Sequence, residues 1–65
     1  MNITLNGQQI ETQQITLEAL LQEQGYDDCT VATAVSGQFV PVKERANLTL
    51  QEGAIIEVVA PMQGG

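Results

Sequence analysis

The sequence predicts an α+β domain in which one helix covers one face of a single sheet. Polar and apolar residues alternate near the start of the chain, a β-branched segment over residues 55–60 favours a last strand, and one segment between them has the apolar spacing of a helix. The 65 residues, 43% of them hydrophobic, suffice for one thin core and hence for one domain. A single helix cannot cover both faces of a sheet, so we expect the opposite face to be partly bare.

A hairpin of two strands is expected at the amino-terminal end. Polar and apolar side chains alternate over residues 2–6, which is the pattern of a half-buried strand. Asn6-Gly7 tolerates positive φ and therefore favours a tight turn. A second strand should follow over residues 8–12.

A short helix is expected over residues 17–24. Its apolar stripe consists of Leu17, Leu20 and Leu21. Thr16 is placed to cap the first turn with its hydroxyl, and Gly25 is placed to end the helix in the left-handed conformation.

Two strands and a turn are expected after the helix. Residues 31–35 are small and largely β-branched, so they favour a strand, but both alternate sets are apolar or small and do not reveal which set faces the core. Ser36-Gly37 favours a hairpin into residues 39–42, where a proline places the strand at an edge or a strand end. Lys43-Glu44-Arg45 is expected as a solvated turn or single helical turn.

The last strand is expected over residues 55–60. Glu57 should face water, so Ile55 and Val59 share its outer face and the residues between them face the core. Because this outer face should be partly bare, Ile55, Glu57 and Val59 form a candidate surface for a protein partner. Scattered exposed aliphatic residues are also ordinary on soluble proteins.

The charge balance excludes some classes of partner. Two basic and eight acidic residues give a net charge of -6, which repels phosphate backbones and anionic lipid, so we expect neither nucleic acid nor membrane as a partner. The acidity suits docking onto a basic protein surface, although many domains are acidic merely for solubility.

The residue inventory argues against catalysis and against secretion. The chain has no His, no glycine-rich phosphate loop and no metal-ligand spacing, since Asp27-Asp28 lacks further oxygen ligands and reads as a solvated connector. We therefore expect no enzyme activity and no metal or cofactor bound by the chain itself. Cys29 stands alone and is expected to be a small, partly buried hydrophobe. With no apparent targeting segment, we expect a cytoplasmic protein.

The end of the chain is the remaining candidate site. Pro61 withholds a backbone donor and ends the ladder, so we expect residues 1–60 to form the domain and residues 61–65 to form a flexible tail. Five extended residues reach about 17 Å, and Gly64-Gly65 would fit a narrow cleft in a partner. Two terminal glycines can also be a frayed end. The residues expected to thread into a partner are Pro61, Met62, Gln63 and Gly64.

Three segments carry a resemblance that spans the chain. They are residues 34–41 (AVSGQFVP), residues 50–57 (LQEGAIIE) and the ending Met62-Gln63-Gly64-Gly65. Together with the chain length and the start NITLNG, they resemble the ThiS family of sulfur carriers in thiamine thiazole synthesis.

The resemblance implies a ubiquitin-like β-grasp fold with one mixed sheet, and a chemistry located at Gly65. In this family a ThiF-type adenylating enzyme uses ATP and Mg²⁺ to convert the terminal carboxylate to an acyl-adenylate. Sulfur from a donor of the persulfide type then gives a thiocarboxylate, which is passed to a thiazole synthase of the ThiG type. A free carboxylate is ionised at neutral pH and needs such activation.

Two alternatives stay open at the level of sequence. A related sulfur carrier, such as the small subunit of molybdopterin synthase, shares the Gly-Gly end and the chemistry but is usually longer. The other alternative is a β-grasp interaction module whose tail is inert.

Overall fold

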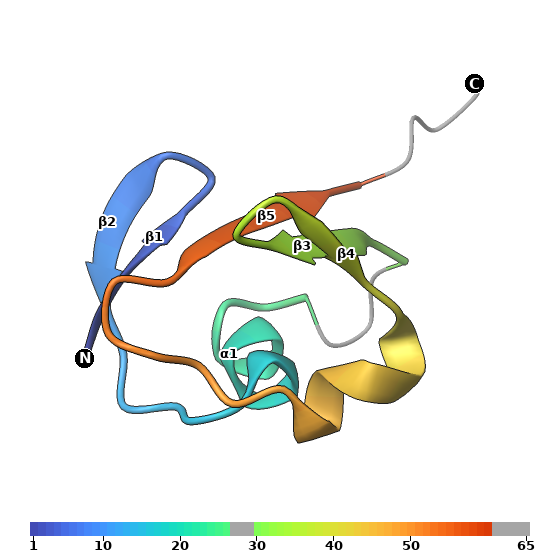
Figure 1. Cartoon of the computed structure of the whole chain (residues 1–65), viewed down its shortest axis with the longest axis horizontal. Coiled ribbons are helices and arrows are strands. Elements are labelled where there is room, and N and C mark those ends of the chain that lie inside the picture. Colours follow the sequence, from blue (N-terminus) through green and yellow to red (C-terminus); the bar gives the residue numbers. More distant parts are fainter. Residues whose placement is uncertain (27–29, 61–65) are drawn as a thin grey trace.

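The computed structural model describes residues 1–26 and 30–60, which fold into one sheet with two helical segments on one side of it (Figure 1). In chain order the elements are β1 (Asn2–Leu5), β2 (Gln8–Glu11), α1 (Leu17–Glu23), β3 (Ala32–Val35), β4 (Gln38–Val40), the 3-10 helix η1 (Val42–Asn47) and β5 (Ile55–Val59). The predicted α+β class is confirmed. Predictions that concern Asp27-Asp28, Cys29 and residues 61–65 lie outside the described residues.

The strand order β2-β1-β5-β3-β4 places the last strand at the centre of the sheet. β5 runs parallel to β1 and antiparallel to β3, so the sheet is mixed. The remaining pairs, β1 with β2 and β3 with β4, are hairpins. This order brings the two ends of the described chain onto neighbouring strands.

Both predicted hairpin turns are present. Asn6 and Gly7 have φ of 51° and 81°, and Ser36 and Gly37 have φ of 52° and 80°. Two successive residues with positive φ match the right-handed twist of the flanking strands. The Asn-Gly and Ser-Gly pairs therefore set the register of the two hairpins.

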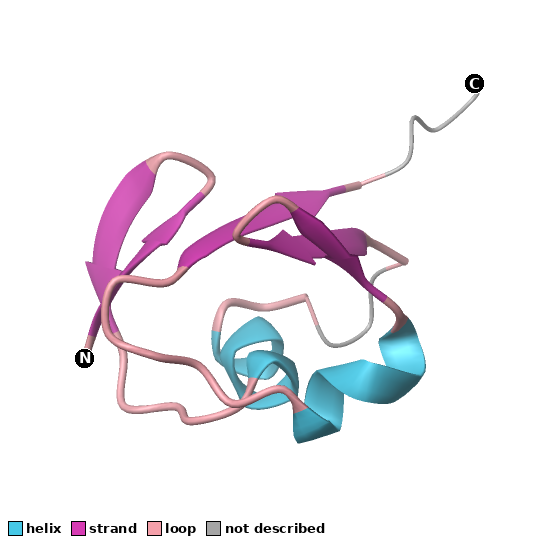
Figure 2. Cartoon of the chain, in the orientation of Figure 1, coloured by secondary structure: helices cyan, strands magenta, loops and turns pink. Residues whose placement is uncertain are grey.

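The helix begins and ends where its flanking residues predict. The Thr16 hydroxyl oxygen accepts a hydrogen bond from the Ala19 backbone N–H at 3.2 Å, which caps the first turn. Gly25, with φ of 88°, follows the last turn in the left-handed conformation. The helix is one residue shorter than predicted. It lies with η1 on the same side of the sheet (Figure 2), and no helix in the described ranges has the length and apolarity to cross a membrane.

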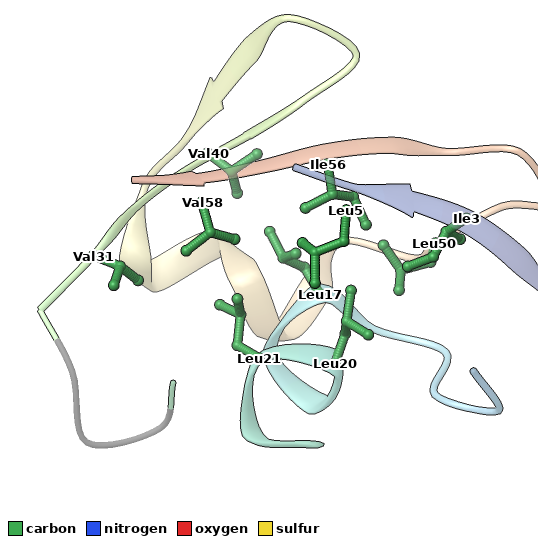
Figure 3. Packing of buried hydrophobic residues seen from close by; sticks show 10 residues of the cluster. All are labelled: Ile3, Leu5, Leu17, Leu20, Leu21, Val31, Val40, Leu50, Ile56 and Val58. Carbon is green, nitrogen blue, oxygen red and sulfur yellow. The ribbon is translucent and has the colours of Figure 1, made fainter. Parts of the chain in front are cut away.

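The core lies between this side of the sheet and the helices (Figure 3). Side chains from β1 and β5 meet the leucine stripe of α1, and Ile3, Leu17, Leu20 and Ile56 are almost completely buried. The ten buried apolar residues are Ile3, Leu5, Leu17, Leu20, Leu21, Val31, Val40, Leu50, Ile56 and Val58. They contain no aromatic ring, and the chain has only two aromatic residues, Tyr26 and Phe39.

The segment after β4 differs from the prediction. The strand ends at Val40, and the chain continues through Pro41 into η1, so residues 41–42 are not strand. The prediction that Arg45 is solvated is wrong, because its side chain is buried. Its guanidinium donates to the Val31 carbonyl at 2.6 Å and to the Thr33 hydroxyl at 3.2 Å. These hydrogen bonds offset the cost of burying the guanidinium. The sequence does not indicate them, because the acceptors lie 12 and 14 residues before Arg45.

The facing of β3, which the sequence leaves open, follows from these contacts. Val31 and Thr33 are buried against the core side, and Ala32 lies on the exposed side. The Thr33 hydroxyl donates to the Val40 carbonyl at 3.1 Å and accepts from Arg45. A polar residue can occupy this inner position because both of its hydrogen-bonding roles are filled.

Candidate functional site

The carboxyl end of β5 leads directly to the predicted tail. The described chain ends at Ala60, five residues before Gly65. Gly65 and its neighbours Pro61, Met62, Gln63 and Gly64 lie outside the described residues, so their roles remain predictions. The structure does describe the platform from which they continue.

That platform is fixed on both sides of β5. Toward β3, Val59 pairs with Ala32. Toward β1, strand pairing ends at Ile56, but the Asn6 side-chain oxygen accepts a hydrogen bond from the Val58 N–H at 2.8 Å. The Asn6 side chain thus accepts a hydrogen bond that a backbone carbonyl of β1 would otherwise accept, at the point where β1 ends and the chain turns away from β5. The last strand is held in place up to the residues that precede the tail.

The two faces of β5 alternate as predicted. Ile56 and Val58 face the core and are 0% and 7% exposed, whereas Ile55 and Val59 are 54% and 63% exposed. Glu57 lies between the latter two on the same face and is also exposed. The predicted orientation of these five residues is confirmed, and the role of the outer three in partner contact remains a prediction.

Phe39 also lies on this face, although the sequence does not predict it. Phe39 pairs with Ala34 of β3, and Ala34 pairs in turn with Glu57 of β5, so all three side chains lie on the outer face. Phe39 is 69% exposed. The sequence does not reveal which face of the sheet Phe39 occupies, because residues 39–41 are all apolar and show no alternation. We call the set Ile55, Glu57, Val59, Phe39, Ala32 and Ala34 the outer patch.

A groove at the other end of β5 offers no catalytic arrangement. It has a volume of about 500 Å³ and lies between the β3–β4 hairpin and residues 48–54. Of its two carboxylates, that of Glu52 accepts the Asn2 backbone N–H at 3.1–3.2 Å, and Glu44 has no histidine to act with, since the chain contains none. Within residues 1–26 and 30–60, no three His, Cys, Asp or Glu side chains are grouped to hold a metal ion.

One comparison with known proteins shows the family of this chain, and another shows its fold. The model of the ThiS family matches residues 3–65, and a search of curated protein sequences found no match. Among solved structures, the chain is similar to a thiamine biosynthesis protein (ThiS) from Geobacter metallireducens. The TM-score is 0.82 and the identity 21%, with 100% of each chain covered. This likeness confirms the β-grasp fold expected from the sequence.

Proposed function

The chain belongs to the ThiS family, a family of sulfur carriers in thiamine biosynthesis, and we propose that its Gly65 carboxylate is the group that carries the sulfur. The observation that supports this most directly is the extent of the family match, which runs from residue 3 through the terminal glycine. The tail therefore belongs to the shared pattern along with the fold. The chain's lack of histidine and of nucleotide-binding motifs fits a protein that other enzymes act on.

The chemistry follows from the low reactivity of a carboxylate. Its oxyanion attacks the α-phosphorus of ATP, pyrophosphate leaves, and the acyl-adenylate that forms has AMP as a good leaving group. A sulfur donor of the persulfide type displaces AMP, and cleavage of the S–S bond by a thiol leaves the thiocarboxylate. The adenylating partner, of the ThiF type, supplies the ATP and Mg²⁺ site. The carrier supplies only a reachable acyl end, on a tail of at most about 17 Å.

The proposed partners divide the cycle between loading and delivery. The adenylating enzyme and the sulfur donor load the tail, and a thiazole synthase of the ThiG type takes the sulfur for the thiazole ring. We propose that Ile55, Glu57 and Val59 contact a partner while Pro61, Met62, Gln63 and Gly64 thread into its cleft. Gly64 and Gly65, at the end of this segment, carry no side chains, so the last part of the tail can enter a narrow cleft.

Intact-mass measurement tests the proposal. The full chain is incubated with ATP, Mg²⁺, a ThiF-type enzyme and a persulfide donor, and we expect a mass gain equal to the difference between sulfur and oxygen. Deletion of Gly65 should abolish this gain and leave thermal unfolding unchanged, because the described core ends before the tail. An unchanged mass with an enzyme that loads its own carrier would favour the inert interaction module.

A second measurement separates the two kinds of sulfur carrier. The loaded chain is offered to a thiazole synthase and, in parallel, to the large subunit of molybdopterin synthase. Sulfur loss to the thiazole synthase alone is the expected result. Transfer to the molybdopterin subunit alone would show that the chain is a sulfur carrier for molybdopterin synthase and not for thiazole synthesis.

A further inference from the structure

Two hairpin turns contact the central strand β5, one from each side. In the β1–β2 turn, the Asn6 backbone N–H donates to the Ile56 carbonyl at 2.9 Å. In the β3–β4 turn, the Ser36 backbone N–H donates to the Ile55 carbonyl at 2.8 Å. Asn6 and Ser36 have almost the same φ, 51° and 52°, and each precedes a glycine. Within the described part of the chain, only Asn6 of these two adds a side-chain bond to β5, since its Oδ1 accepts the Val58 N–H at 2.8 Å.

The Asn6 side chain takes the place of a backbone carbonyl in the parallel pairing of β1 with β5. In a parallel pair, a residue donates its N–H to the neighbouring strand, and its own carbonyl accepts an N–H two residues further along that strand. Asn6 donates to Ile56, and Val58 is the residue two positions on. Because the left-handed φ of Asn6 takes its backbone out of the strand conformation, its side-chain oxygen accepts the Val58 N–H instead. The contact with β5 thus continues to Val58, although strand pairing with β1 ends at Ile56.

This hydrogen bond lies close to the start of the predicted tail. Val58 is two positions before Ala60, where the described chain ends. On the other side of β5, Val59 pairs with Ala32 of β3. Without the Asn6 oxygen, the Val58 N–H would lose its acceptor and the end of β5 would be held from the β3 side alone. A strand end that is held from one side opens more readily than one held from both.

We infer that Asn6 is a positioning residue for sulfur loading, because its side-chain oxygen fixes the end of β5 and so the point from which the tail reaches the adenylating partner. A strand end that is ordered in the free protein loses no further conformational entropy when a partner takes the tail. A strand end that opens must be ordered again on binding, and this cost weakens the complex. The inference rests on the proposed function and adds to it a residue of the first hairpin.

Variants of Asn6 can separate the side-chain bond from the turn itself. Asn, Asp and Gly are all favoured where a tight hairpin turn needs positive φ. Asn6→Asp keeps an oxygen that can accept the Val58 N–H, whereas Asn6→Gly keeps the turn and removes the acceptor. Ser36→Gly is the matched control, because it makes the same change to glycine at the equivalent position of the other turn. That turn contacts β5 through the backbone N–H, which glycine retains.

Hydrogen exchange of the Val58 amide, followed by NMR on the free full-length chain, tests the contact apart from the chemistry. We expect exchange about tenfold faster in Asn6→Gly than in the wild type, because the amide loses its acceptor. Asn6→Asp should restore the protection, and Ser36→Gly should leave it within about twofold of wild type. Thermal unfolding of each variant distinguishes local opening from a general loss of stability. Equal protection of Val58 in the two glycine variants would overturn the inference.

Steady-state kinetics of adenylation by a ThiF-type enzyme, measured as pyrophosphate release, tests the positioning role. For Asn6→Gly we expect the KM for the carrier to rise about three- to tenfold. The kcat should stay within about twofold of wild type, because the ordering cost weakens the ground-state complex and the transition state equally. Asn6→Asp and Ser36→Gly should have a KM close to that of the wild type.

The outcomes separate the inference from the proposed function. If the wild type gains no sulfur in the mass assay, the proposed function fails and the loading role of Asn6 fails with it, while the exchange data still decide whether Asn6 holds β5. Normal loading with the same KM in Asn6→Gly and Ser36→Gly would remove the positioning role and leave the carrier chemistry. A raised KM that Asn6→Asp does not restore, although Val58 is protected in that variant, would show that the Asn6 amide contacts the partner directly. That result would also overturn the inference.

Discussion

The two faces of β5 carry the same kinds of residue and serve different ends. Ile56 and Val58 are buried under α1, whereas Ile55 and Val59, one position away, are more than half exposed. Sequence composition does not distinguish them, because isoleucine and valine occur on both faces. The difference arises because the helical segments cover only one side of the sheet. The covered face holds the fold together, and the uncovered face leaves apolar area exposed.

Truncation of one isoleucine on each face tests this division and should give the largest effect on stability. Ile56→Ala removes a fully buried side chain, so we expect a loss of about 2–5 kcal/mol in the free energy of unfolding. Ile55→Ala, the neighbouring residue on the outer face, should change it by less than about 0.5 kcal/mol. Urea unfolding followed by circular dichroism measures both. Similar losses in the two variants would show that the outer face is also part of the folding core.

Arg45 is the buried charged residue on the covered face, and its replacement should have an intermediate effect on stability. Arg45→Met keeps an apolar stem but removes the donor to the buried Val31 carbonyl, so we expect a loss of about 1–3 kcal/mol. Thr33 keeps its bond to Val40 in this variant. Lys43→Met is the matched control, because Lys43 is an exposed cation of the same helical segment. An Arg45→Met protein as stable as wild type would mean that relief of guanidinium desolvation offsets the lost bonds.

The local features of the fold could be predicted because nearby residues determine them. The Asn6-Gly7 pair forms a turn of positive φ, the Thr16 hydroxyl caps the helix by accepting the N–H three residues ahead, and Glu57 marks the outer face of β5. Each of these depends on residues within a few positions of one another. The same holds for the stripe of leucines in α1.

The features that could not be predicted depend on contacts between distant segments. Arg45 is buried because acceptors on β3 meet it, and a charged side chain in a polar run otherwise favours solvent. Phe39 belongs to the outer patch only because β4 pairs with β3 in a register that places it beside Ala34. Neither the pairing of β5 with β1 and β3 nor its central place in the sheet is encoded by local periodicity. The candidate surface was therefore predicted in part, through β5, and its aromatic member required the structure.

A polar group at the edge of the covered side, Glu23 with its two hydrogen-bond donors, should contribute least to the free energy of unfolding. Its contribution should depend on pH. The Glu23 carboxylate accepts hydrogen bonds from the Thr12 hydroxyl at 2.7 Å and the Gln14 amide at 3.3 Å. These bonds, that of Thr12 foremost, hold the pKa of Glu23 below its ordinary value. A carboxyl whose pKa is lower in the folded state stabilises the fold above its unfolded pKa. The contribution is lost as the pH falls through the folded pKa.

Comparison of wild type with Glu23→Gln at two pH values isolates this contribution. We expect the wild type to be the more stable at pH 7 and the difference to shrink as the pH falls below about 4.3, the ordinary glutamate pKa. Thr12→Val, which keeps the shape of the side chain and removes the principal donor, should weaken the same pH dependence. Urea unfolding at neutral and acid pH measures both variants. Because the Glu23 carboxylate is at the surface, the difference should be small. A difference that stays constant with pH would show that these hydrogen bonds do not favour the ionised form of Glu23 in the folded protein.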